Sequence, residues 1–362
     1  MATYRKQVYC EFEFLKKYRD SSSTFNILTD ENAVQMWLNV GKFIRKSQIM
    51  IDIKEEQFEQ KCKTLPEKLN IAKKRVQGEC VCSDTHGFEY VENVNNSSAT
   101  RTKTTYLVKK SAGICSNYAS KFGIVTLSPS YWSSEEDAKA NSYLFRNCGR
   151  SIEEGEYLTW ADVLQSQHNL SNCNSMVIID NYILKSLDNL EEILNALLPG
   201  PIRGVTREDK FYLTIITAQD RNGTRNDENI YSQLVKKIKE EIRPNLDFEL
   251  DLYVEHNTSS NTFHDRYILT NNVIIKSGGG FDLIKNGKAT KQTEVSILHP
   301  GIQSINDACD DEYMGVINRV TSKVVKKVKQ WKHYPANKPC TNRLILSMPP
   351  SETNANDTKS YK

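Results

Sequence analysis

Among the side chains of this sequence, a histidine and an arginine two residues apart are the strongest candidates for catalysis or ligand binding. His264 and Arg266 lead into the apolar run Tyr267–Leu269, which is typical of a β-strand. Residues two apart in an extended chain leave the backbone on the same face, so we expect both side chains to act on one group. An imidazole can attack phosphorus or transfer a proton, and a guanidinium can bind two phosphate oxygens. The pair suits a phosphodiester.

The residues that follow predict a hairpin and a glycine loop. Asn271-Asn272 is a turn pair that tolerates positive φ, and Val273–Ile275 reads as the return strand. Three glycines, Gly278–Gly280, then allow the backbone to pass close to a ligand. Backbone N–H groups of Ser277, Gly278 and Gly279 are expected to form an anion-binding nest, with Lys276 adding a charge beside them.

This pattern resembles a known superfamily. His264-x-Arg266, four residues, Asn271, six residues and Gly278-Gly279 match the spacing of the phospholipase D signature His-x-Lys-x4-Asp-x6-Gly-Ser. The run from His264 through Asp282, with Gln292–Leu298 behind it, is more similar still to the phospholipase D-like C-terminal domain of MIT-domain proteins. There a His-Asp-Arg strand precedes a glycine-rich loop and a Glu-Thr strand. The resemblance implies a layered α/β domain.

The resemblance also implies roles for single residues. Active members of the superfamily are hydrolases that form a phosphohistidine on paired histidine motifs, without a metal ion or cofactor. His264 would then be the nucleophile or proton carrier, and Arg266 would hold the non-bridging oxygens. Asn271 would orient the histidine or the phosphate. Glu294 would fix the tautomer of His264 by accepting a ring N–H.

Three departures from the signature bear on activity. Arg266, Asn271 and Gly279 stand where the superfamily has lysine, aspartate and serine. Arginine keeps the charge and gains bidentate geometry, but it donates no proton at neutral pH. Asparagine removes the carboxylate that would make a histidine more basic.

The chain contains one copy of the motif. No other histidine has Lys or Arg two residues later. Superfamily active sites use two motifs across a pseudo-twofold axis, so catalysis by this chain requires a symmetric homodimer through the C-terminal domain.

The sequence therefore predicts a metal-independent phosphodiesterase that is a nuclease rather than a lipase, in a host-defence or toxin context. One alternative is a non-catalytic module, because the MIT-associated domains resemble lipid-binding modules more than enzymes. It would bind nucleic acid or anionic lipid through Arg266, Lys276 and the basic segment 319–332. The other alternative is a metal-dependent nuclease near the N-terminus, built on carboxylates of Glu11, Glu13, Asp30 and Asp52.

Composition limits the setting. The 362 residues carry a net charge of +3, so any contact with nucleic acid or membrane must come from a local patch. The 9 cysteines show no disulfide-framework spacing, and no apolar run approaches the ~20 residues of a membrane span. Met1–Lys17 lacks an apolar signal core, so a reduced, cytoplasmic protein is expected. Cys80, Cys82 and His86 could ligate zinc by type, but their spacing favours incidental thiols.

The elements that must position the site form an α/β pattern in two parts. Residues 1–165 predict an α/β or α+β domain of unknown role that could bind a partner protein, beginning with a half-buried strand at Tyr9–Leu15. Residues 170–346 alternate strands and helices, which is typical of a layered α/β domain. The apolar run Met176–Ile179 ends in Asp180-Asn181-Tyr182 and resembles the opening of phospholipase D-like domains. Residues 347–362 predict a disordered tail.

Overall fold

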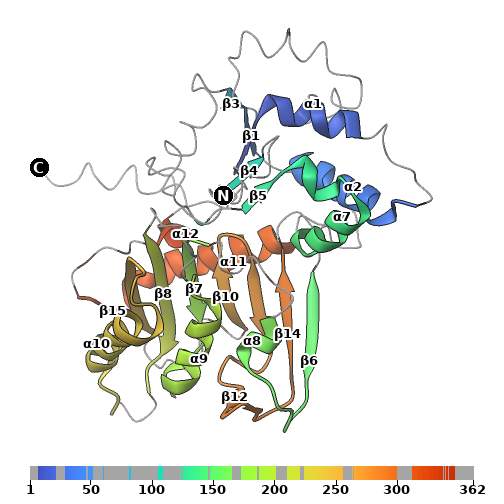
Figure 1. Ribbon diagram of the computed structural model, residues 1–362. Coiled ribbons are helices and arrows are strands. Elements are labelled where there is room, and N and C mark those ends of the chain that lie inside the picture. The colour runs from blue at the N-terminus through green and yellow to red at the C-terminus, as the bar shows by residue number, and fades with distance from the viewer. Residues whose placement is uncertain are drawn as a thin grey trace, which may run out of the picture.

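The described residues form two large β-sheets, which lie one above the other in Figure 1, and a small two-stranded one. The fold is that of a computed structural model. It describes residues 7–21, 29–45, 48–51, 60, 81–82, 105–108, 123, 125–145, 147–164, 173–185, 187–200, 210–220, 224–255, 263, 265–299, 312–336, 338, 340 and 342–346.

The first sheet has five strands, and every strand pairing in it is parallel. A buried aromatic cluster around Phe14, Phe43 and Trp132 joins it to its helices. The strand order is β3 (Val81–Cys82), β2 (Gln48–Ile51), β1 (Gln7–Cys10), β4 (Thr105–Val108) and β5 (Val125–Leu127), and the helices are α1 (Phe12–Ser21), α2 (Glu31–Arg45) and α7 (Glu135–Asn141).

The predicted strand Tyr9–Leu15 is wrong beyond Cys10. The strand ends there and α1 begins at Phe12. The apolar residues of this stretch satisfy a helix as well as a strand, because Phe12 and Leu15 are three apart and both are buried. Packing of Phe14 edge-on against Trp132, at 5.8 Å between ring centroids, favours the helix.

The second sheet has eight strands and is mixed. Its centre is parallel, with β7 beside β8 and β8 beside β9, and the remaining pairings are antiparallel. The strand order is β15 (Lys332–Tyr334), β9 (Phe248–Glu255), β8 (Phe211–Ala218), β7 (Ser175–Ile179), β10 (Arg266–Thr270), β11 (Ile274–Ser277), β14 (Thr293–Leu298) and β6 (Cys148–Ile152).

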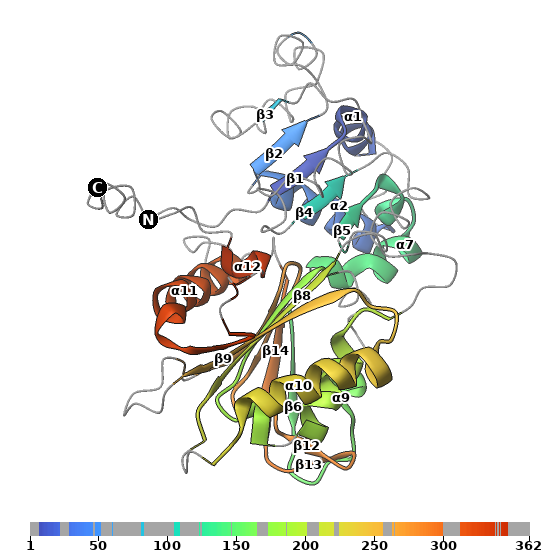
Figure 2. The same ribbon diagram turned by 90° about the vertical axis from the view of Figure 1, so that its left-hand side faces the viewer.

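Helices cover both faces of this sheet, as Figure 2 shows. One face carries α8 (Trp160–Leu164), α9 (Leu187–Leu197) and α10 (Asp227–Lys237), and the other carries α11 (Glu312–Lys327) and α12 (Arg343–Leu346). The prediction of a layered α/β fold is confirmed at this level.

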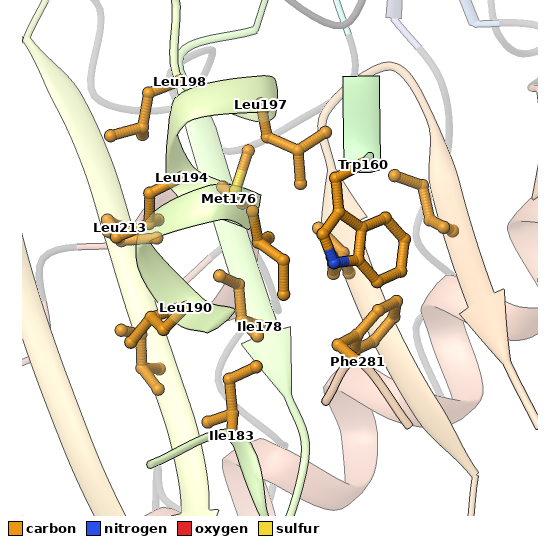
Figure 3. Packing of buried hydrophobic residues seen from close by; sticks show 14 of the residues in the cluster. Trp160, Met176, Ile178, Ile183, Leu190, Leu194, Leu197, Leu198, Leu213 and Phe281 are labelled. Carbon is orange, nitrogen blue, oxygen red and sulfur yellow. The ribbon is translucent and has the colours of Figure 1, made fainter. Parts of the chain in front are cut away.

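Leucine-rich packing under α9 forms the larger core. Figure 3 shows Leu190, Leu194 and Leu197 over the sheet, beside the rings of Trp160 and Phe281. These two rings lie 5.6 Å apart between centroids, and both are almost fully buried. Phe281 follows the glycine loop directly, so this packing fixes the end of the loop.

Shorter elements connect the main strands and helices. The β12–β13 hairpin follows the glycine loop, and a π-helical turn ends α10. These elements and the remaining turns are η1 (Pro129–Trp132), η2 (Ser142–Phe145), η3 (Ile183–Lys185), η4 (Ile238–Ile242), η5 (Val328–Gln330), β12 (Ile284–Lys285) and β13 (Lys288–Ala289).

The predicted division near residue 165 falls after one strand of the second sheet, β6, and after a helix that packs on that sheet, α8. Strand β6 pairs with β14, and Trp160 of α8 is buried in the core under α9. The predicted tail 347–362 lies outside the described residues. Within the described part of the chain, no helix has the length and apolarity needed to cross a membrane.

We predict that the fold tolerates a side chain at Gly280 poorly. Its φ is +93°, and an added Cβ would lie 3.0 Å from Asp282 Oδ1 and 3.1 Å from Asp180 Oδ2. Gly287 also has positive φ, but open space surrounds it. Gly287→Ala should lower the free energy of unfolding by about 1–2 kcal/mol, the cost of positive φ alone. Gly280→Ala should lower it by more, because the steric contacts add to that cost. Urea denaturation measures both losses.

Gly200→Ala is the control for alanine itself, because Gly200 has neither positive φ nor a neighbour within 4 Å. It should be neutral or slightly stabilising. Equal losses at positions 280 and 287 would contradict the steric part of this prediction.

Candidate functional site

Arg266 lies at the end of the sheet where the parallel strands finish. It is the first residue of β10, and its neighbour Tyr267 pairs with Ile179, the last residue of β7. Because β7 and β10 are antiparallel, the next residues beyond this pair, Arg266 and Asp180, lie side by side at the end of the two strands. By strand alternation Arg266 shares a face with Ile268, which is buried under α9. Ligands of open α/β sheets bind at this carboxyl end.

Asp180 is a buried carboxylate that connects three segments. Its Oδ2 accepts a hydrogen bond of 2.7 Å from the Phe281 N–H, and its Oδ1 accepts one of 2.8 Å from the Tyr182 N–H. Burial raises the pKa of Asp180, and the Asp282 carboxylate acts in the same direction. The two amide hydrogen bonds and the Arg266 charge oppose that rise. Asp180 thus holds the glycine loop against the end of β7.

Two cations lie against one aromatic ring at this end of the sheet. The Arg266 guanidinium carbon is 5.8 Å from the centroid of Tyr182, and the Lys185 ammonium is 4.2 Å from the same centroid. Arg266 also makes a long hydrogen bond of 3.5 Å from Nη1 to the Gly278 carbonyl. Tyr182, Lys185 and Arg266 all retain exposed surface, so a phosphate or an aromatic base could reach them.

A salt bridge borders the cluster. Lys291 Nζ lies 2.6 Å from Asp282 Oδ1, and Asp282 and Asp180 both approach Gly280. The formal charges of these two acids are equal and opposite to those of Arg266 and Lys291. Lys185 is the additional positive charge.

The glycine loop does not form the predicted anion nest. The Gly278 N–H donates to the Glu294 carbonyl at 3.2 Å, and the Gly279 N–H donates to Thr293 Oγ1 at 2.7 Å. The Ser277 hydroxyl donates to the Gly280 carbonyl at 2.6 Å. The two glycine amides thus hold the loop on β14, because a buried or half-buried amide needs an acceptor within the protein, and the Ser277 hydroxyl closes the loop on itself.

Lys276 and Glu294 project from the other face of the sheet. Lys276 pairs with Tyr267, whose ring is buried under α11, and Glu294 directly precedes Val295, which is buried on the α9 side. Lys276 Nζ lies 3.5 Å from Asp265 Oδ2, which also accepts from the Tyr267 hydroxyl at 2.8 Å. The structure therefore does not bring either residue to the Arg266 side chain.

Asn271 lies at the opposite end of β10 from Arg266. The two residues are five apart along an extended strand, or about 16 Å at about 3.3 Å per residue. Asn271 is 2% exposed, and its amide donates to the Gly123 carbonyl and accepts from the Asn174 N–H. It joins the two sheets where they meet, so its placement is structural.

Some predicted residues cannot be compared with this geometry. His264 lies outside the described residues, as do Asp52, Cys80 and His86. Glu13 forms an ion pair of 2.6 Å with Lys16. Within the described ranges, no group of three or more His, Cys, Asp or Glu side chains is arranged to hold a metal ion.

The set of predicted site residues omitted Asp180, Tyr182 and Lys185. Their signal was present, since the apolar run Met176–Ile179 stops at an acid and a tyrosine. Sequence alone did not show that this strand end lies beside Arg266.

Comparisons with known proteins add little. No protein-family profile matches the chain, and no curated protein matches it. Among solved structures it is similar to TrmBL2, described as an archaeal chromatin protein with a novel mode of DNA binding. The identity is 14% and the TM-score is 0.24, with 55% of this chain and 60% of that chain covered.

We predict that Asp180 makes stability fall as pH rises. Burial raises its folded pKa above the ordinary 3.8, so the unfolded chain releases the proton first. The free energy of unfolding of the wild type minus that of Asp180→Asn should decrease from pH 3.8 upward, until the folded pKa is passed. Urea denaturation across pH measures this difference.

Asp162→Asn is the matched control with the opposite sign. Hydrogen bonds from Thr159 lower the pKa of Asp162, so the corresponding difference should increase with pH up to the ordinary value. Parallel slopes for Asp180 and Asp162 would contradict the assignment.

A second prediction concerns Asn271→Asp, which restores the superfamily residue. A carboxylate cannot donate to the Gly123 carbonyl, so the variant should lose about 1–3 kcal/mol of unfolding free energy. It should not gain phosphodiester binding or cleavage, because Asn271 is far from Arg266. A gain in cleavage would restore the role that the sequence predicted.

Proposed function

We propose that the eight-stranded sheet is a phospholipase D-like domain that binds a phosphodiester through Arg266 and cleaves it without a metal ion. The observation that carries this proposal is the position of Arg266. Its guanidinium lies at the carboxyl end of the parallel strands, against Tyr182 and beside Lys185. His264, two residues earlier in the chain, is the proposed nucleophile.

The proposed reaction has two steps. An imidazole nitrogen of His264 forms a bond to phosphorus while the bond to the leaving oxygen breaks, and that oxygen takes a proton. Arg266 stabilises charge on the non-bridging oxygens but cannot supply the proton at neutral pH. His264 of a second copy supplies it in a symmetric homodimer and then activates the water that cleaves the phosphohistidine.

Nucleic acid is the proposed substrate class. A partly exposed aromatic ring beside cations, that of Tyr182, suits a base stacked next to a phosphate. Among the residues that the structure describes, the only large apolar side chains that are exposed are Leu38 and Tyr157. Two scattered side chains do not form a surface that inserts into lipid.

A second candidate is phosphodiester binding without cleavage. It is favoured by the placement of Glu294 on the opposite face and by the internal hydrogen bonds of Gly278 and Gly279. Fewer of the predicted groups then converge on one phosphorus atom. A role for residues 1–165 in binding a partner protein stays a prediction.

The decisive experiment is cleavage of labelled DNA and RNA by purified protein in EDTA. We expect wild-type cleavage, and a loss of at least about 100-fold in His264→Ala with substrate binding retained, because proton transfer and nucleophilic attack both depend on the imidazole. Arg266→Ala should weaken binding as well. Lys210→Gln is the control, since this lysine directly precedes β8, at the opposite end of the parallel strands from Arg266.

Each other outcome has a defined meaning. Binding by the wild type without cleavage selects the non-catalytic candidate. Equal cleavage by wild type and His264→Ala rejects the assignment of this histidine. Activity that falls on dilution in step with dissociation of a dimer supports the paired site, and full activity of a monomer rejects it.

A further inference from the structure

We propose that the exposed side of α11 and the turn after it form a second contact surface for the phosphate backbone of nucleic acid. This inference rests on the proposed function only for its choice of ligand. The surface, called the basic stripe, lies on the opposite face of the sheet from Tyr182. It consists of the exposed side chains of Arg319, Lys323, Lys326, Lys327, Lys329 and Lys332.

Helix geometry aligns these charges. Arg319, Lys323 and Lys326 are four and three residues apart, so they lie on one side of α11 within about 60° at 100° per residue. They span about 10 Å along the helix at 1.5 Å per residue. One strand of a duplex carries a phosphate every 3.4 Å of its axis, so about three phosphates face this length.

The charge of the stripe is not balanced locally. No Asp or Glu occurs between Tyr313 and Tyr334. Within the described part of the chain, none of the five lysines of the stripe takes part in an ion pair, whereas Lys210 and Lys291 do. A cluster of exposed cations without counter-charges repels itself, and a polyanion relieves that repulsion.

Two ordinary roles do not account for the stripe. Lys326 and Lys327 lie in the last turn of α11, where cations stabilise the helix dipole, but Arg319 and Lys323 lie one to two turns earlier. The apolar side of α11 is already used, because Val316, Val320 and Val324 are buried against the sheet. No apolar side remains for insertion into a bilayer, so nucleic acid is the favoured partner over a membrane.

The stripe begins beside the proposed site. Burial raises the pKa of Tyr267, the residue after Arg266 in β10, and Arg319 lies close enough to its hydroxyl to oppose that rise. At this end of β10, Arg319 therefore lies on the α11 side of the sheet and Arg266 lies on the α9 side. A nucleic acid that passes over this end of the sheet can contact both, with the stripe adding sequence-independent affinity.

The test is duplex DNA and RNA binding by the full chain at several salt concentrations. The variant is Lys323→Gln/Lys326→Gln/Lys329→Gln. At low salt it should bind on the order of 10- to 100-fold more weakly than wild type. The slope of log K against log salt should become shallower by about 2–3, because about 0.9 is lost per phosphate contact.

The matched control is Lys236→Gln/Lys239→Gln/Lys285→Gln, which removes the same charge from exposed positions away from α11. It should retain the wild-type slope. The variant with arginine at 323, 326 and 329 should bind like wild type. Unchanged circular dichroism and melting temperature show that each variant folds.

The outcomes separate this inference from the proposed function. Equal slopes for the α11 variant and the control overturn the stripe, whatever happens to cleavage. A loss of binding to phosphatidylserine vesicles without a loss for DNA or RNA overturns the choice of partner. Salt-sensitive binding that depends on the stripe, in a protein whose His264→Ala form cleaves like wild type, supports the stripe and rejects the proposed catalysis.

Discussion

The proposed site depends on the hydrogen bonds that the buried carboxylate of Asp180 accepts. This carboxylate stands at the end of a parallel strand, takes hydrogen bonds from two backbone amides, and loses most of its hydration. Such a charge is costly unless it is compensated. Its hydrogen-bond partners are the amides of Tyr182 and of Phe281, the residue that closes the glycine loop, and the Arg266 charge also lowers its pKa. The hydrogen bond to Phe281 therefore fixes the loop, and the carboxylate explains why Gly280 has no side chain.

Strand alternation divides the polar residues of the hairpin between two environments. Arg266 faces the side covered by α9, together with Tyr182 and Lys185. Lys276 and Tyr267 face the side covered by α11, together with Asp265 and Arg319. A single strand end thus presents positive charge on both faces of the sheet. This arrangement suits an extended polyanion better than a small ligand enclosed in a cavity.

The contact between the two sheets lies at the other end of β10. Asn271 accepts from the amide of Asn174 and donates to the carbonyl of Gly123, so one side chain satisfies groups from both parts of the chain. This separation leaves the Arg266 end away from the first sheet (Figure 1). Among the described residues before 165, those of β6 and α8 belong with the second sheet, and Trp160 packs against Phe281 at the end of the glycine loop.

The sequence by itself determined the α/β layering, the helix faces and the hairpin from β10 to β11, because these follow from local apolar periodicity and turn residues. It also determined that Arg266 precedes a strand and a glycine loop. It did not determine which residues meet there. Asp180 reaches Arg266 only because β7 pairs with β10, whereas Glu294 and Lys276 are turned away by strand register. A period of two fixes which side chains share a face, but only long-range pairing brings strands together, and that pairing is decided by the packing of the whole sheet.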